Sequence, residues 1–206
     1  MSSEGTSPAA SIVDLYKRHA KAWVGARLRQ DHLYEQHWLD RFCGLLPPKG
    51  NVLDLGCGAG APIALYLANH GFNVIGVDSS PQMIAMFRER LPNQIAYVQD
   101  MRTLALNQQF HGILAWDSFF HLAHDDQHHM FPIFRAHALP GCALMFTSGT
   151  DHGEAIGSLE GEPLYHASLD TEEYRTLLRR EGFEVVSHVT EDPTCGDRSI
   201  WLARMS

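Results

Sequence analysis

A glycine-rich turn carries the clearest chemical signal in the sequence. Residues 54–61 read DLGCGAGA, and they follow a short apolar stretch and precede a helical one. Gly56, Gly58 and Ala61 fit the G-x-G-x-x-G/A spacing of nucleotide-binding turns. Asp78 follows about 20 residues later, at the end of a second apolar stretch, where an acid can accept hydrogen bonds from both ribose hydroxyls. Together these residues predict a ligand that contains adenosine.

Charge separates the two common ligands of such a turn. A dinucleotide brings a pyrophosphate, which the carboxylate of Asp54, two residues before Gly56, would repel. S-adenosylmethionine instead carries an ammonium, a sulfonium and one carboxylate, and the N-terminus of the following helix can hold that carboxylate. Asp100, after a third apolar stretch, can accept from the adenine amino group. Three acids around one site favour S-adenosylmethionine; the alternative is that Asp54 caps the turn and Asp100 only begins a loop.

From about residue 51 to the C-terminus, the chain resembles the class I S-adenosylmethionine-dependent methyltransferases. Residues 52–60 (VLDLGCGAG) resemble the first motif of the family, and residues 76–83 (GVDSSPQM) resemble the second. Asp100 and Met101 resemble the adenine-binding acid and its neighbour, and residues 116–118 fall at the fourth-strand motif. The resemblance implies S-adenosylmethionine as cofactor, S-adenosylhomocysteine as product, and these cofactor contacts: Asp54, Gly56, Cys57, Gly58, Gly60, Pro62, Asp78, Ser79, Met83, Asp100, Met101, Arg102, Trp116 and Asp117.

His121 is the candidate general base for methyl transfer. It follows the fourth predicted strand, and an imidazole titrates near neutral pH. Transfer from a sulfonium is an in-line displacement, in which the protein supplies alignment and, where needed, a base. The alternative is that His121 packs against the strand end or bonds a backbone carbonyl. Ser118 and Phe120, beside it, are candidate substrate contacts.

Two further segments supply candidate substrate contacts. Glycines recur every four residues in 149–161, which prevents a helix and predicts a substrate loop carrying Glu154, Tyr165 and His166. A plain connecting loop is the alternative. In the resembling family, N-terminal extensions fold over the cofactor, so residues 1–46 are expected to form a helical lid with Tyr16, Trp23 and Arg27 at the substrate. Residues 47–206 then form the cofactor-binding domain.

The elements that must position these residues alternate between strand and helix. Strands are predicted at 51–55, 72–77, 95–98, 112–116 and 142–147, with two more at 183–189 and 199–203. Helices are predicted at 12–19, 33–46, 60–69, 81–90, 126–138 and 171–181, with an interruption at Gly25 and a turn at Pro140 and Gly141. The alternation predicts one Rossmann-like α/β domain. Its seven-stranded sheet is expected to be mostly parallel, with helices on both faces and an antiparallel last strand.

Composition limits the partners. The formal charge is -8 with three lysines, which disfavours nucleic acid and leaves a small-molecule substrate. No apolar run is long enough for a membrane helix. Four cysteines without C-x-x-C spacing, and no signal peptide, predict a cytoplasmic protein, as monomer or homodimer. His124 and His128 lie four apart and can share a helix face, but the acids beside them favour a solvated face, so no metal is predicted.

Two rival functions stay open. An NAD(P)-dependent oxidoreductase of the short-chain type needs a Tyr-x-x-x-Lys pair, and no lysine follows Lys49. A non-catalytic regulator that binds S-adenosylmethionine would have the same glycine turn, because binding and turnover share those residues.

Overall fold

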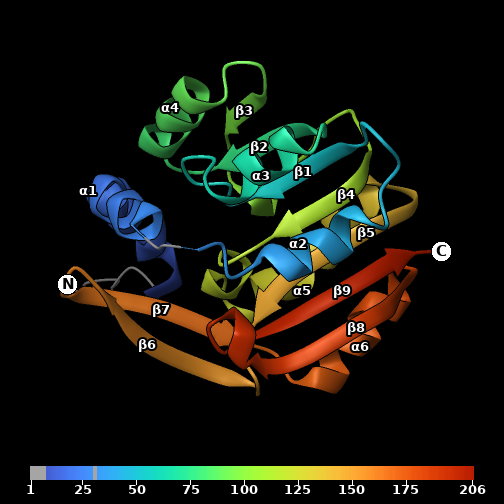
Figure 1. Ribbon diagram of the computed structural model, residues 1–206. Helices are drawn as coiled ribbons and strands as arrows, with labels where there is room; N and C mark the ends of the chain where they lie inside the picture. The colour runs from blue at the N-terminus through green and yellow to red at the C-terminus, as the bar shows by residue number, and fades with distance from the viewer. Residues whose placement is uncertain (1–7, 30–31) are drawn as a thin grey trace.

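The computed structural model describes residues 8–29 and 32–206, so parts of the predicted extension 1–46 lie outside the described residues. Seven strands form one sheet in the order β3-β2-β1-β4-β5-β9-β8 (Figure 1). The strands span Asn51–Leu55 (β1), Asn73–Asp78 (β2), Ile95–Val98 (β3), Phe110–Ala115 (β4), Ala138–Ser148 (β5), Phe183–Asp192 (β8) and Arg198–Met205 (β9). Strands β3, β2, β1, β4 and β5 pair in parallel, and β9 is antiparallel to both β5 and β8. The predicted fold class is confirmed.

Helices cover both faces of the sheet. On one face, α2 (Gln36–Cys43), α3 (Ile63–Asn69) and α4 (Pro81–Arg90) bury Trp38, Leu67 and Phe87 against the strands. On the other, α5 (His124–His137) and α6 (Thr171–Arg180) bury aromatic side chains that include Phe131, Phe134 and Tyr174. The short apolar strands are therefore buried on both sides, as parallel strands require.

The predicted loop in 148–166 is wrong as secondary structure. Residues Gly153–Leu159 (β6) and Glu162–Ser168 (β7) form an antiparallel hairpin outside the main sheet (Figure 1). Its turn is Glu160 and Gly161, both with positive φ. The glycines at 153 and 157 lie within β6, where an extended backbone accommodates them.

The first helix is longer than predicted, and Gly25 does not interrupt it. Helix α1 spans Pro8–Leu28 and lies between α4 and the hairpin (Figure 1). Ile12 and Leu15 pack with Tyr165 and Ala167 of β7. Further along, Ala20 and Val24 pack with Ala59 and Met83. Because residues on both sides of Gly25 are held by these contacts, tertiary packing outweighs the helix cost of one glycine.

Smaller differences concern element ends. Helix α3 begins at Ile63 rather than at Gly60, because Gly60 has a φ of +77°. Helix α2 begins at Gln36 and ends at Cys43, inside the predicted 33–46. The predicted turn at Pro140 and Gly141 lies inside β5, where the pairing with β4 shifts register. Among the described residues, no helix is long and apolar enough to cross a membrane.

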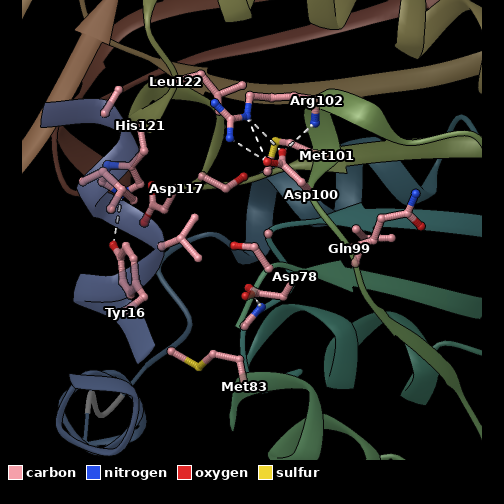
Figure 2. Close-up of a pocket in the computed structure, with 18 of the residues that line it drawn as sticks. Tyr16, Asp78, Met83, Gln99, Asp100, Met101, Arg102, Asp117, His121 and Leu122 are labelled. Atoms are coloured by element: carbon pink, nitrogen blue, oxygen red, sulfur yellow. Dashed lines mark hydrogen bonds and ion pairs between the residues drawn. The ribbon is translucent and has the colours of Figure 1, made fainter. Parts of the chain in front are cut away.

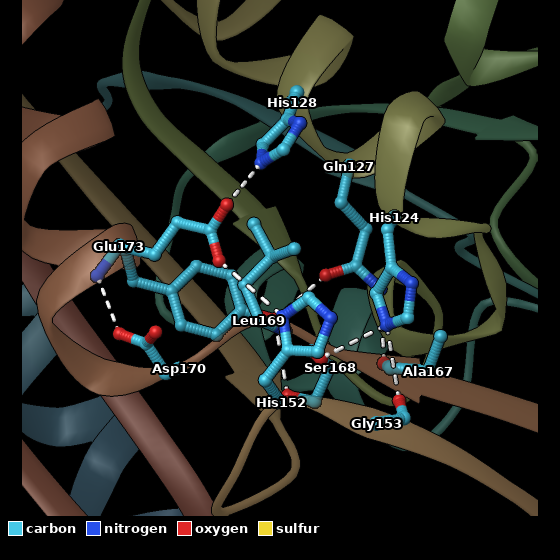
Figure 3. Close-up of polar contacts among 11 residues, drawn as sticks. His124, Gln127, His128, His152, Gly153, Ala167, Ser168, Leu169, Asp170 and Glu173 are labelled. Carbon is cyan, nitrogen blue, oxygen red and sulfur yellow. Dashed lines mark hydrogen bonds and ion pairs between the residues drawn. The ribbon is translucent and has the colours of Figure 1, made fainter.

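The histidines of α5 join elements together. His128 Nε2 lies 2.7 Å from Glu173 Oε1 of α6, and His152 Nδ1 lies 3.4 Å from the other oxygen of the same carboxylate (Figure 3). His124 Nε2 lies 3.1 Å from the carbonyls of Gly153 and Ser168. Within residues 8–29 and 32–206, no group of three or more histidine, cysteine, aspartate or glutamate side chains could hold a metal ion.

Candidate active site

A cleft with about 900 Å³ of open space lies at the carboxyl edge of the sheet, under helix α1. The ends of β1, β2, β3 and β4 form its floor, where a doubly wound sheet binds its ligands. Most of the predicted cofactor and substrate residues line it (Figure 2): Tyr16, Trp23, Gly56, Gly58, Asp78, Ser79, Met83, Asp100, Met101, Arg102, Trp116, Asp117, Ser118 and His121.

Asp78 is fixed at the end of β2 by two backbone amides. Gly58 N donates to its Oδ2 at 3.0 Å, and Ser80 N donates to its Oδ1 at 2.8 Å. Each oxygen keeps a lone pair for a ligand. Burial raises the pKa of Asp78, although the two amide bonds act to lower it. The two amides therefore fix the position of the Asp78 carboxylate, but they do not fully offset the cost of burying its charge.

Asp54 lies beneath the glycine turn rather than in the cleft wall. Its side chain is 3% exposed, and burial together with the charge of Asp78 raises its pKa to about 7. A cation in the cleft would lower both pKa values. The chain thus builds a site whose acids are under-compensated, which fits a positively charged ligand and does not fit a pyrophosphate.

The glycines of the turn allow close packing. A Cβ on Gly56 would lie 2.2 Å from Ser118 Cβ, and one on Gly60 would lie 2.7 Å from Phe87. Both residues have positive φ. Gly60 faces helix α4, so with Cys57 and Pro62 it lies outside the cleft wall and shapes the turn. Ser118 lines the cleft, but its hydroxyl donates to the carbonyl of Leu55 at 2.7 Å.

Asp100, the predicted adenine-binding acid, is held by an arginine. Arg102 bonds Asp100 and reaches Asp126 at 3.0 Å (Figure 2). Burial acts to raise the pKa of Asp100, but the hydrogen bonds from Arg102 lower it more. Asp100 is thus ionised at neutral pH. Gln99, which the sequence analysis did not single out, lines the cleft beside it.

The amides of the glycine turn are already bonded inside the chain. Gly56 N and Cys57 N both donate to Val77 O, and Gly60 N donates to Cys57 O. Helix α3 begins only at Ile63, so its first N–H groups lie beyond the glycine turn. The expectation that the N-terminus of this helix holds the cofactor carboxylate at the turn is therefore not supported. A different donor lies in the wall. Trp116 is 5% exposed, and its Nε1 has no hydrogen-bond partner among the described residues. A buried N–H without a partner is costly, so this group is a candidate donor to a bound ligand or to a water.

His121 and Tyr16 meet inside the cleft although 105 residues separate them. The Nδ1–H of His121 donates to Tyr165 O at 2.8 Å, which leaves Nε2 as the acceptor for the Tyr16 hydroxyl at 3.0 Å (Figure 2). Burial lowers the pKa of His121 to about 4. The imidazole is therefore neutral at physiological pH. Tyr16 reaches it from α1, and burial raises its pKa.

Asp117 ends the fourth-strand motif in a left-handed backbone conformation, with a φ of +49°. Its carboxylate accepts from Arg198 Nε at 2.7 Å and from the terminal nitrogen at 2.6 Å. Arg198 in turn lies over the Tyr34 ring, with Arg27 on that ring as well. Asp117 therefore lines the cleft with its charge already paired.

The remaining substrate candidates lie outside this cleft. Arg27 forms an ion pair with the buried Glu35. This pair explains the position of the Arg27 guanidinium without a substrate carboxylate. Tyr165 packs against α1, and its hydroxyl donates to Glu154 at 2.8 Å. Phe120, Glu154 and His166 line a second hollow along the β6–β7 hairpin. The His166 ring lies 4.9 Å from that of His121, so the two hollows share a wall.

Three residues of the cleft wall were not predicted: Ala9 lies before the predicted start of the first helix, and Ile12 and Val13 lie within it but were not singled out. Ala9, Ile12 and Val13 line the cleft with Tyr16. Their spacing places them on one face of a helix that starts at Pro8. The pairing of Tyr16 with His121 had no local signal at all.

Known proteins were compared with this chain. Residues 52–141 match the family described as the methyltransferase domain. Over 72 residues, 32% of this chain and 31% of the relative, it is 40% identical to a magnesium-protoporphyrin O-methyltransferase from Rhodobacter capsulatus. The aligned part of the chain spans about a third of the length of the first curated relatives it matches.

Solved structures share the fold over their full lengths. Magnesium protoporphyrin IX methyltransferase from Synechocystis PCC 6803, with bound S-adenosylmethionine, matches with a TM-score of 0.75 and 15% identity, covering 100% of each chain. A Burkholderia thailandensis 1,6-didemethyltoxoflavin-N1-methyltransferase, with 1,6-didemethyltoxoflavin and S-adenosylhomocysteine bound, matches with a TM-score of 0.76 and 18% identity, covering 100% of this chain and 93% of that one.

Proposed function

We propose that this chain, whose residues 52–141 match the methyltransferase domain and whose fold is shared with a structure that holds S-adenosylmethionine, is a class I methyltransferase that transfers a methyl group from S-adenosylmethionine to a small-molecule acceptor. The observation that carries the proposal is the pair of buried acids at the glycine turn. Asp54 and Asp78 both have raised pKa values, so the cleft favours a cationic ligand. The acidic charge of the chain supports a small acceptor over RNA.

Four regions of the cleft would hold the cofactor. Asp78 would accept from the ribose hydroxyls with the lone pairs that Gly58 and Ser80 leave open. Asp100 and Gln99 line the adenine end. Asp54 would act through its charge from beneath the turn. Trp116 Nε1, the orphaned donor, would bond the cofactor carboxylate. When bound, S-adenosylmethionine supplies an electrophilic methyl carbon on a sulfonium.

His121 is proposed as the proton acceptor. Its tautomer is fixed by the Tyr165 carbonyl, so Nε2 presents a lone pair to the cleft. A weak base suffices for this reaction, because the proton on the nucleophilic atom becomes strongly acidic as its bond to the methyl carbon forms. Helix α1 would exclude water from the cleft, as a lid does. Its residues Ile12, Val13 and Tyr16 already lie over it.

Methyl-labelled S-adenosylmethionine tests the proposal. The protein is incubated with the labelled cofactor and a pool of small metabolites, and the products are followed by mass spectrometry. We expect a labelled compound together with S-adenosylhomocysteine, both dependent on the protein. Binding of the cofactor without transfer to any compound would instead support a non-catalytic regulator.

A further inference from the structure

The acceptor end of the cleft is distinguished by its lack of free charge among the described lining residues. Beyond the cofactor regions, the wall consists of Ile12, Val13 and Leu122, with Tyr16 and His121 as its polar groups. Asp117 is paired with Arg198, and Asp126 is paired with Arg102. A charged acceptor would lose its hydration there without gaining a counter-charge, which is costly.

The Tyr16 hydroxyl already makes the bond that an acceptor would need. It donates to Nε2 of His121 at 3.0 Å, and the two rings meet edge to face with centroids 5.5 Å apart. The other nitrogen of His121 is engaged by Tyr165 O. The phenol group of Tyr16 is therefore already hydrogen-bonded to His121, the candidate base, inside the cleft.

From this geometry we infer that the acceptor is an uncharged aromatic hydroxyl compound, whose hydroxyl takes the place of the Tyr16 hydroxyl on Nε2 of His121. The inference rests on the proposed function. A carboxylate has no proton to donate to Nε2, and its charge meets the lone pair of that atom. An alkylammonium can donate, but it has no nucleophilic lone pair until it loses a proton. A neutral aromatic hydroxyl has the proton, the nucleophilic oxygen and the apolar body that suit this wall.

The step balances without a further reactant. The oxygen of the acceptor forms a bond to the methyl carbon, and the carbon–sulfur bond breaks with its electron pair kept by sulfur. The hydroxyl proton passes to Nε2 of His121. The products are a methyl aryl ether, S-adenosylhomocysteine and a protonated imidazole, which returns its proton to water when the cleft opens.

Four compounds of matched shape test the class of acceptor. The protein saturated with S-adenosylhomocysteine is titrated with 4-methylphenol, 4-methylcyclohexanol, 4-methylbenzylamine and 4-methylbenzoate, and binding is followed by the ¹⁵N resonance of His121 Nε2. We expect 4-methylphenol to bind about tenfold more tightly than each of the others, to shift that resonance, and to be methylated when S-adenosylmethionine is supplied. Tighter binding or faster methylation of the amine, the carboxylate or the aliphatic alcohol would overturn the inference.

Tyr16→Phe gives a second readout. It removes the competing hydroxyl and keeps the ring, so we expect the affinity for 4-methylphenol to rise about threefold, with S-adenosylhomocysteine affinity unchanged. A fall in 4-methylphenol affinity would mean that Tyr16 holds the acceptor, against the inference. If wild-type protein binds S-adenosylhomocysteine but no phenol, only this inference fails. If it does not bind S-adenosylhomocysteine, the proposed function fails.

Discussion

Asp78 accepts hydrogen bonds from two backbone amides and still has acceptor capacity on both oxygens. If these oxygens hold the ribose, Asp78→Ala removes two charge-assisted bonds, each worth about 1.5–3 kcal/mol. We expect S-adenosylhomocysteine affinity to fall about 100-fold or more in calorimetry. Asp170→Ala is the matched control, because Asp170 also accepts a backbone amide, that of Glu173, as the cap of α6 away from the cleft. Equal affinities in the two variants would refute the ribose role.

The buried carboxyl group of Asp54 is expected to make both stability and cofactor binding depend on pH. Its folded pKa, raised to about 7 by burial and by Asp78, exceeds the ordinary value of 3.8. The folded protein without ligand therefore binds a proton more tightly than the unfolded chain, and it loses stability as pH rises from about 4 through 7. Asp54→Asn removes this cost, so we expect it to stabilise the free protein at pH 8, by on the order of 3 kcal/mol, and much less at pH 4.

Denaturant unfolding of wild type and Asp54→Asn at both pH values measures this effect. The same substitution is expected to weaken S-adenosylmethionine binding, because it removes a charge near the cation. A gain in stability of equal size at pH 4 and pH 8 would show that ionisation of Asp54 is not its source.

If His121 is the proton acceptor, its pKa sets the pH below which turnover declines. Transfer that uses a neutral imidazole is lost as pH falls through the folded pKa, which burial lowers to about 4. At saturating cofactor, we expect the rate of methyl transfer to stay level from pH 8 to about 5 and to decline below. His121→Asn should lower that rate by about 10²–10⁴-fold and leave S-adenosylhomocysteine affinity unchanged. An acid limb centred near 6.5 would contradict the buried, neutral state.

At the scale of elements, helix α1 is held over the cleft by two sets of apolar contacts. Leu15 is 2% exposed and packs on the β6–β7 hairpin with Ile12 and Tyr165. Leu15→Ala leaves a cavity costing about 2–5 kcal/mol at that contact. We expect faster amide hydrogen exchange in α1 and faster release of S-adenosylhomocysteine, with the sheet strands unaffected. Lys21→Ala, on an exposed position of the same helix, should change neither. Equally faster amide hydrogen exchange in α1 and in the sheet strands would contradict the idea that α1 opens independently of the sheet.

The secondary-structure elements also show which parts of the fold can be predicted from the sequence. Strand β3 and helix α4 have the bounds that were predicted, because apolar runs and a proline in the first turn are local signals. The β6–β7 hairpin was not predicted, because Gly153 and Gly157 interrupt the alternation of apolar and polar residues in β6 and because β6 is mostly exposed. Asp78 and Asp100 were predicted from strand ends, whereas the contact of Tyr16 with His121 joins distant segments and depends on tertiary packing.

For the whole molecule, one arrangement explains both the fold and the site. Parallel strands bring Asp54, Asp78, Asp100 and Asp117 to the same edge of the sheet, where two of the four acids are paired with arginines and two are not. Asp100 and Asp117 are paired with arginines. Asp54 and Asp78 are not compensated in the same way, as their raised pKa values indicate. The molecule therefore keeps negative charge at the glycine turn that a cationic cofactor can neutralise.

Calorimetric titration of the wild-type protein with S-adenosylmethionine, S-adenosylhomocysteine and NAD distinguishes a methyl-donor site from a dinucleotide site. The buried acids favour the cationic S-adenosylmethionine, and the same acids repel a pyrophosphate. We expect S-adenosylmethionine and its product to bind with micromolar affinity, about −8 kcal/mol, and NAD to give no heat of binding. Saturable binding of NAD, with none of S-adenosylmethionine, would contradict the account.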